Sequence, residues 1–315
     1  MQKRIVLLIC VLASCLVQAQ SYPQKSVRIV VPFAPGGASD IIARTVAADL
    51  TETFGQNVVV DNRGGGGTVL GTEIVARAPA DGHTLLVNTP SFTINAGVRK
   101  LPYDSINDFM PVTLIAVSPL MLVTHPSLPV KNVRDLIVLA RAQPGQLVYA
   151  SSGQGSPTHM GMELLRFSGV RMTHVPYKGA APAMTDLIGG HVQLMQTSVI
   201  VVKPHAAAGR MRPIAVTTMR RSAAMPEVPT IAETIPGYEV LNWWGLMTPA
   251  RAPAAIIERL NVEIAKVMAK QAHRERFSAE GIDAAPGTSA EFAGMLRNEI
   301  AKWGKVGKEI GLKLD

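Results

Sequence analysis

Four polar segments that contain glycine each follow an apolar run typical of a buried strand. They span residues 32–40, 64–68, 151–159 and 175–183, and helical patterns follow them. Glycine adopts backbone conformations closed to other residues and leaves amide groups exposed. A helix N-terminus adds unpaired N–H groups and the positive end of the helix dipole. This combination binds anions, so we expect a carboxylate ligand, with a plain structural turn as the alternative for each segment.

Two of these segments carry side chains that could act chemically. Ser39 and Asp40 lie where they could cap the helix that follows. Ser152 and His159 could form the nucleophile and base of a hydrolase, but the chain has no G-x-S-x-G motif and no assignable acid to orient the histidine. We favour hydrogen bonding of a carboxylate by hydroxyl and amide groups, with His159 assisting or simply packing. Hydrolysis is kept as an alternative.

Other chemistries find little support in the sequence. The glycines of residues 64–71 do not form G-x-G-x-x-G, and no G-x-x-x-x-G-K-[ST] occurs, so we expect no cofactor. The seven histidines form no H-E-x-x-H motif, so we expect no metal site. The 31 Lys and Arg residues exceed the 23 Asp and Glu residues, but they are spread along the chain and aromatics make up only 5%. We therefore expect no nucleic-acid partner and no catalytic residues.

The first residues resemble an export signal. Lys3 and Arg4 precede the apolar run 5–17, and small residues end at Ala19. We expect residues 1–19 to be a signal peptide, which places the mature protein in the periplasm. A lipid anchor at Cys15 is the alternative. Cys10 and Cys15 are the two cysteines, so cleavage after Ala19 would leave no thiol.

The strand and helix patterns that must position these segments alternate along the chain. Runs rich in Val, Ile and Leu at residues 27–31, 58–61, 84–88, 112–124, 147–150, 173–177, 192–196 and 214–217 predict strands. Helical spacing is clear at 39–54 and in two C-terminal helices. The chain is long enough for two lobes. If residues 112–124 and 239–247 cross between them, residues 20–120 and 246–315 form the first lobe and residues 121–245 the second.

Ordered motifs over nearly the whole mature chain resemble one family. The chain is similar to the substrate-binding proteins of tripartite tricarboxylate transporters, the Bug or TctC family. The motifs include Tyr22-Pro23, residues 32–37, Asp61-Asn62-Arg63, residues 80–86, residues 151–159, residues 175–183, residues 226–230 and Trp244-Gly245. One departure occurs at residues 192–197, where Val-Gln-Leu-Met-Gln-Thr replaces the usual Val-Asp-Leu-Met-Phe-Asp. The loss of two acids favours a simple carboxylate or a neutral aromatic acid over an amino acid.

The resemblance implies an α/β fold of the periplasmic-binding-protein type II-like class, with two lobes joined by two crossover strands and a ligand cleft between them. It implies a monomer that captures a small carboxylate for the membrane permease subunits of a transporter, without enzymatic activity. A sensor subunit of a signalling system is the alternative. The implied ligand-binding residues are Phe33, Ala34, Gly36, Gly37, Ser39, Asp40, Gly67, Thr68, Ser151, Ser152, Ser156, His159, Tyr177 and Gly179.

Overall fold

The computed structural model describes residues 22–309 and Gly311. The predicted signal peptide and both cysteines lie outside these residues. Strands and helices alternate, as the sequence predicts. The strands are β1 Val27–Val31, β2 Val58–Asn62, β3 Thr84–Asn88, β4 Phe109–Thr124, β5 Val148–Ser151, β6 Thr173–Pro176, β7 Leu194–Ser198, β8 Arg212–Val216, β9 Leu241–Pro249 and β10 Asp283–Ala284.

The helices are α2 Ala38–Phe54, α3 Val69–Ala76, α4 Ser91–Val98, α5 Val133–Ala142, α6 Pro157–Leu164, α7 Ala180–Ile188, α8 Val199–Ala207, α9 Ala254–Ala269, α10 Gln271–Ala279 and α11 Ser289–Glu309. Three short 3₁₀ helices are η1 Gly66–Thr68, η2 Leu165–Ser168 and η3 Ile231–Glu233. Residues 288–291 form the expected capping box of α11, because the Glu291 amide donates to Thr288 Oγ1 and the Thr288 amide donates to Glu291 Oε2.

The described strands form one sheet in the order β2-β1-β3-β9-β4-β7-β5-β6, with β8 and β10 also paired to β4. β1 runs parallel to β2 and β3, and β5 runs parallel to β6 and β7. β4 joins these two parallel groups. Up to Pro119 it pairs antiparallel with β9, and from Leu120 it pairs antiparallel with β7. One long strand therefore runs from one half of the fold into the other.

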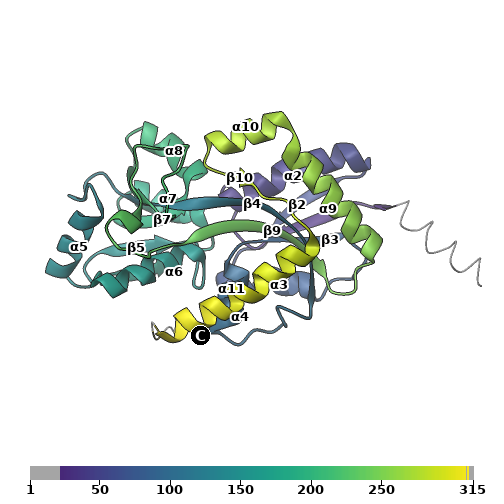
Figure 1. Cartoon of the computed structure of the whole chain (residues 1–315), viewed down its shortest axis with the longest axis horizontal. Coiled ribbons are helices and arrows are strands. Elements are labelled where there is room, and N and C mark those ends of the chain that lie inside the picture. Colours follow the sequence, from purple (N-terminus) through teal and green to yellow (C-terminus); the bar gives the residue numbers. More distant parts are fainter. Residues whose placement is uncertain (1–21, 310, 312–315) are drawn as a thin grey trace, which may run out of the picture.

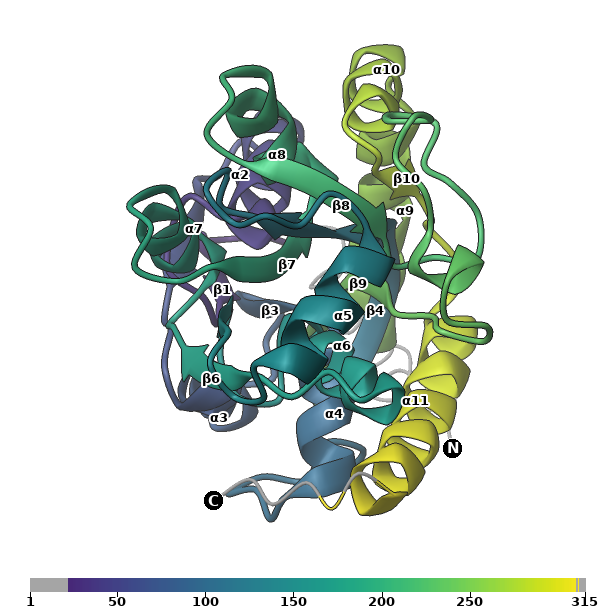
Figure 2. The same cartoon turned by 90° about the vertical axis from the view of Figure 1, so that its left-hand side faces the viewer.

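The two halves form the lobes of the molecule (Figure 1). The first lobe holds β1–β3, β9, β10 and the start of β4 with helices α2–α4 and α9–α11. The second holds β5–β8 and the end of β4 with helices α5–α8. Figure 2 shows the second lobe from its outer side. Because β4 changes partners between Pro119 and Leu120, and β9 begins to pair at Leu241, the strands connect the lobes near these positions. The lobe boundaries by residue number stay a prediction.

Helices cover both faces of the sheet in each lobe. In β1, Ile29 faces the core against α2 and α9, and Val30 faces the core that contains Phe92 of α4. In β4, Leu122 and Met121 likewise face opposite cores of the second lobe. Alternate side chains point to opposite faces of a strand, so a strand covered on both faces is apolar throughout. This explains the continuous apolar runs in the sequence. The carboxyl ends of these strands remain available for the polar segments.

Candidate functional site

The segments predicted to bind a ligand meet where the two lobes touch. The Ala34 amide of the first lobe donates a hydrogen bond of 2.8 Å to the Lys178 carbonyl of the second. Glycine permits this approach, because a Cβ on Gly64 would lie 2.8 Å from the Lys178 carbonyl oxygen. A Cβ on Gly179 would lie 3.0 Å from the Ala34 nitrogen. The loops after β1, β2 and β6 are therefore packed backbone to backbone.

A second contact between the lobes lies at η1. Gly67 faces the loop after β5, and a Cβ on Gly67 would lie 2.2 Å from the backbone oxygen of Gln154. Gly67 has a φ of 62°, in the left-handed region that favours glycine. The Asn95 side chain holds this turn by donating to the Gly67 carbonyl at 2.7 Å. Both the close approach and the backbone conformation require glycine here.

A cavity of about 40 Å³ lies between the lobes. Side chains and backbone from both lobes surround it. Its lining residues are Phe33, Gly37, Ala38, Ser39, Thr89, Leu120, Ser152, Pro157, Thr158, Ala180, Thr197, Ser198 and Asn242. No ionisable side chain belongs to this lining, so its polar character comes from hydroxyl groups, one amide side chain and the backbone.

Five helices begin at this cavity. Its lining includes residues at or just before the N-termini of α2, α4, α6, α7 and α8. The helix N-termini of α2, α7 and α8 have no side-chain cap, whereas Ser156 caps α6 and Thr89 Oγ1 accepts from the Ser91 amide at the start of α4. Uncapped N-termini leave backbone N–H groups unpaired and carry the positive end of the helix dipole. The positive ends of these helix dipoles therefore lie at the cavity, whose lining contains no cationic side chain.

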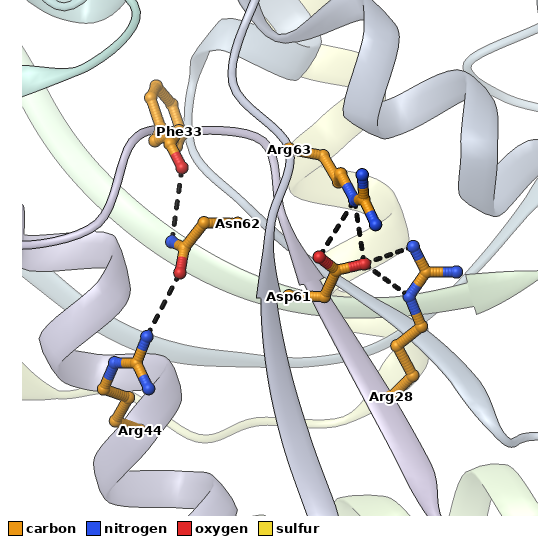
Figure 3. Close-up of polar contacts among 6 residues, drawn as sticks. All are labelled: Arg28, Phe33, Arg44, Asp61, Asn62 and Arg63. Atoms are coloured by element: carbon orange, nitrogen blue, oxygen red, sulfur yellow. Dashed lines mark hydrogen bonds and ion pairs between the residues drawn. The ribbon is translucent and has the colours of Figure 1, made fainter.

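On the first-lobe side, charged side chains hold the loop after β1 (Figure 3). Asn62 Nδ2 donates to the Phe33 carbonyl at 3.2 Å, and Arg44 donates to Asn62 Oδ1 at 3.2 Å. Asp40 accepts hydrogen bonds from the Gly36 amide and from Arg44, each at 3.0 Å. Burial alone would raise the pKa of Asp40, but these hydrogen bonds and the charge of Arg44 more than offset it and lower the pKa. The loop is therefore fixed by an ionised carboxylate.

On the second-lobe side, uncharged groups hold the loop after β5. Ser152 Oγ and Ser156 Oγ lie 3.0 Å and 2.8 Å from Thr158 Oγ1. His159 and His174 stack with ring centroids 4.1 Å apart. Burial lowers the pKa of His159 to about 4, and burial together with His159 lowers the pKa of His174 to about 3. Both rings are neutral near pH 7.

The serines of this loop have hydrogen-bond partners other than those that the hydrolase hypothesis requires. Ser152 contacts Thr158, not His159, and the Gly155 amide donates to His159 Nδ1 at 3.3 Å. Ser151 Oγ lies 2.7 Å from His174 Nε2, but Ser151 is fully buried. These hydrogen bonds of Ser151, Ser152 and His159 therefore hold the loop after β5 in place.

The predicted ligand-binding residues fall into three groups. Those that line the cavity are Phe33, Gly37, Ser39 and Ser152. Those that line an adjoining chamber are Gly67, Thr68, Tyr177 and again Ser152. Those at the contact between lobes or engaged in holding the loops are Ala34, Gly36, Asp40, Ser151, Ser156, His159 and Gly179. Their role in ligand binding stays a prediction.

Three side chains of the predicted segments have hydrogen-bond partners within the protein. Ser39 does not cap α2, because Gly37 is the N-cap residue and Ser39 Oγ accepts from Trp244 Nε1 at 3.0 Å. The Tyr177 hydroxyl donates to Asp186. Gln193 accepts from the Val148 amide at 2.7 Å and supports β5, whereas Thr197, in the same segment that departs from the family pattern, lines the cavity.

Sequence reasoning missed several lining residues. Thr197 and Ser198 end β7, but the strand was expected at 192–196, so its end was placed two residues too early. Thr89 follows β3, but the sequence Thr-Pro at this strand end contains no glycine, so it was not recognised as a polar, glycine-containing junction. The strand-end rule, applied with the observed bounds, finds all three. Asn242 lies inside β9 and gives no such signal.

Among residues 22–309 and Gly311, no cluster of His, Cys, Asp or Glu side chains has three members placed to share a metal ion. The same part of the chain contains no helix with the length and apolar character needed to cross a membrane.

Comparison with known proteins identifies the family. A solved R. palustris protein with adipate is 38% identical, has a TM-score of 0.89, and the match covers 92% of this chain and 98% of that one. MatC from Rhodopseudomonas palustris with bound malate is 30% identical with a TM-score of 0.86, over 90% and 99% of the two chains. The structure of the periplasmic binding protein BugD is 30% identical with a TM-score of 0.89, over 93% and 99%. The predicted periplasmic-binding-protein fold is confirmed.

Sequence relatives agree. The protein BugT of Bordetella pertussis is 36% identical over 303 residues, which are 95% of this chain and 93% of the relative. A UPF0065 protein of Pseudomonas sp., from the tcbD-tcbE intergenic region, is 40% identical over 290 residues, 91% of this chain and 86% of the relative. The family profile described as "Tripartite tricarboxylate transporter family receptor" matches residues 42–312. The chain therefore belongs to the tripartite tricarboxylate transporter family of receptors, the TctC family.

Proposed function

We propose that this chain is a periplasmic binding protein that holds a small carboxylate between its lobes and delivers it to a membrane transporter. The observation that carries the proposal is the set of five helix N-termini around one cavity that has no ionisable lining. Three of them, at α2, α7 and α8, lack side-chain caps. Unpaired amides and helix dipoles provide a ready site for a carboxylate.

Two structural relatives support this ligand class. One is described with adipate and the other with bound malate, and both are carboxylates. The absence of acids from the cavity lining agrees with an anionic guest, because a carboxylate beside the ligand would repel it.

We propose binding without chemical turnover. Ser152 Oγ is paired with Thr158, and His159 accepts from the Gly155 amide, so neither is arranged as nucleophile and base. Replacement of Ser152 by Ala is expected to weaken ligand binding while no product forms from ester or amide substrates in either protein. Hydrolysis that disappears in Ser152→Ala would establish the alternative.

The family supports a role with membrane permease subunits and a periplasmic location for the mature chain. Cells that lack this chain are expected to lose high-affinity uptake of its labelled ligand and to regain it with the full-length gene. Unchanged uptake, with loss of a transcriptional response to the ligand, would instead establish the sensor role.

A thermal-shift screen tests the ligand class. Ligand that binds only the folded state raises the melting temperature, by an amount that grows with concentration. We expect organic acids to raise Tm and neutral sugars to leave it unchanged. Ala180→Leu, which fills the cavity, is expected to abolish the shift, whereas Ala207→Leu at the exposed end of α8 is the control. A rise with sugars alone would contradict the proposal.

A further inference from the structure

An exposed apolar patch lies on the outer side of the second lobe. At its centre are Val138 of α5 and Phe167 of η2, which are 69% and 63% exposed. They are the two most exposed large apolar side chains in the described part of the chain. Isolated apolar residues are common at protein surfaces, whereas neighbouring ones mark sites of interaction. The argument therefore depends on whether these two are neighbours.

Arg141 connects the two halves of this patch. Its Nη2 donates to the Ser168 carbonyl at 2.9 Å, and its Nε lies 3.0 Å from where a Cβ on Gly169 would lie. Arg141 follows Val138 by three positions, so the two share one side of α5. Ser168 directly follows Phe167. The side of α5 that carries Val138 thus lies beside the turn that carries Phe167, and α5 faces the viewer in Figure 2.

Exposed arginines surround the apolar centre. Arg134 lies four positions before Val138, on the same side of α5 as Arg141. The Arg171 carbonyl accepts at 3.0 Å from an amide of the segment that follows α5. Asp135, the one acid of α5, lies in the first turn, where the helix dipole favours a negative charge. None of the three arginines forms an ion pair within the described residues, so their charges are not neutralised.

The positive charge of the chain lies mainly in the second lobe. Residues 121–245 contain 11 Lys and Arg against 6 Asp and Glu, whereas residues 22–120 and 246–309 contain 17 against 16. Close to Phe167 the one acid is Glu163, which is buried and paired with Arg166 at 2.7 Å. The patch therefore presents an apolar centre inside a positively charged surface.

We propose that this α5–η2 patch, formed by Val138, Phe167, Arg134, Arg141 and Arg171, is the surface on which a membrane permease subunit docks. The docking segment of that subunit carries acidic residues beside apolar ones. Guanidinium groups bind carboxylates through two parallel donors, and arginine and aromatic residues are enriched at protein interfaces. A second copy of this chain fits poorly, because two such patches would repel each other. The inference rests on the proposed delivery to a transporter, and adds the docking surface and the charge of the partner.

Binding of the mature protein to its permease subunits in lipid nanodiscs tests the inference. Measurements are made with and without adipate, so that a dependence on the loaded state is also seen. Phe167→Asp places a negative charge at the apolar centre and is expected to weaken binding by about tenfold or more. Arg171→Glu is expected to weaken it by about threefold, and to make it less sensitive to added salt than the wild type.

The matched control is Val262→Asp, which introduces the same charge at an exposed apolar residue of α9. α9 belongs to the first lobe and lies at the opposite end of the molecule from α5 in Figure 1. This variant is expected to bind the permease as the wild type does. All three variants are expected to keep the thermal shift with organic acids, because none of the three positions lines the cavity.

Permease binding by Phe167→Asp and Arg171→Glu that equals the wild type would overturn the inference and leave ligand capture and delivery intact. Equal binding of the wild type to nanodiscs without permease would assign the patch to the lipid surface and would also overturn it. A wild-type dimer in solution that Phe167→Asp converts to a monomer would do the same, in favour of a second copy. Failure of the wild type to bind the permease at all would overturn the proposed delivery itself.

Discussion

The two sides of the cavity are fixed by different chemistry. The loop after β1 depends on ionised groups, since Asp40 accepts from the Gly36 amide and from Arg44. The loop after β5 depends on hydroxyl groups and on neutral histidines, with Ser156 and Thr158 in contact and His159 stacked on His174. Similar strand-to-helix junctions can therefore be stabilised with or without charge. The difference predicts that the two sides respond to mutation and to pH in different ways.

We expect the largest loss of ligand affinity from a substitution at the contact between the two sides. Gly67→Ala places a Cβ 2.2 Å from the Gln154 backbone oxygen, so the lobes cannot approach as they do here. We expect ligand affinity to fall by about 100-fold, or about 2.7 kcal/mol, in calorimetric titration. The matched control is Gly55→Ala, because Gly55 has a φ of 63° and no atom within 4 Å of its Cβ position.

Both variants are expected to lose about 1 kcal/mol of stability from the left-handed backbone, and only Gly67→Ala should lose affinity. Equal affinities of the two variants would show that the lobes need not meet at Gly67.

The charged side is tested by Asp40→Asn. This change weakens the acceptor for the Gly36 amide and removes the partner of Arg44, so we expect a loss of about 2 kcal/mol in urea unfolding at pH 7. The pKa of Asp40 is lowered in the folded state. Its contribution is therefore present above the ordinary carboxyl pKa of about 4 and is lost as the pH falls through its folded pKa. Asp40→Asn and the wild type should converge in stability at low pH, and a constant difference would contradict this account.

The uncharged side is tested in a different pH range. The folded-state pKa of His159 is about 4, so the unfolded chain binds a proton at higher pH than the folded chain does. Stability is therefore greatest above about pH 6.5 and falls as the pH decreases toward 4, by about 1 kcal/mol between pH 6.5 and 5.5 for this group. His159→Gln is expected to make that slope shallower, and Asp40→Asn is expected to leave it unchanged. Identical slopes in His159→Gln and the wild type would refute the assignment.

The smallest effect separates two serines at helix N-termini. Ser156 accepts from the His159 amide and caps α6, whereas Ser198 makes no side-chain cap for α8. Ser156→Ala is expected to cost about 1 kcal/mol of stability. Ser198→Ala is expected to change stability by less than about 0.5 kcal/mol, and to weaken carboxylate binding because Ser198 lines the cavity. Thermal unfolding with and without ligand distinguishes the two results.

The fold could be predicted largely because the central strands, such as β1 and β4, are covered on both faces. Apolar runs mark such strands, and the apolar face of α9 from Ile256 to Met268 is confirmed as buried. The end of β7 was missed because Thr197 and Ser198 are polar, although both are buried within or at the end of the strand. Composition does not show where a buried strand ends when its last residues are polar.

The site was predicted less completely for a related reason. The glycine-containing junctions at Gly37 and Gly179 can be recognised from their residue types, and both lie where the lobes meet. Asn242 is the second residue of β9. Its position at the cavity depends on how distant segments pack, which no local pattern records.

A site without ionisable groups has a thermodynamic consequence. The cavity between the helix N-termini is lined by hydroxyl, amide and apolar groups, so a fully ionised guest entering it exchanges no proton with the walls. The heat of complex formation measured by calorimetry should then be the same in phosphate and in Tris, whose ionisation enthalpies differ widely. Ligand affinity would then stay constant as the external pH changes, until the ligand itself becomes protonated.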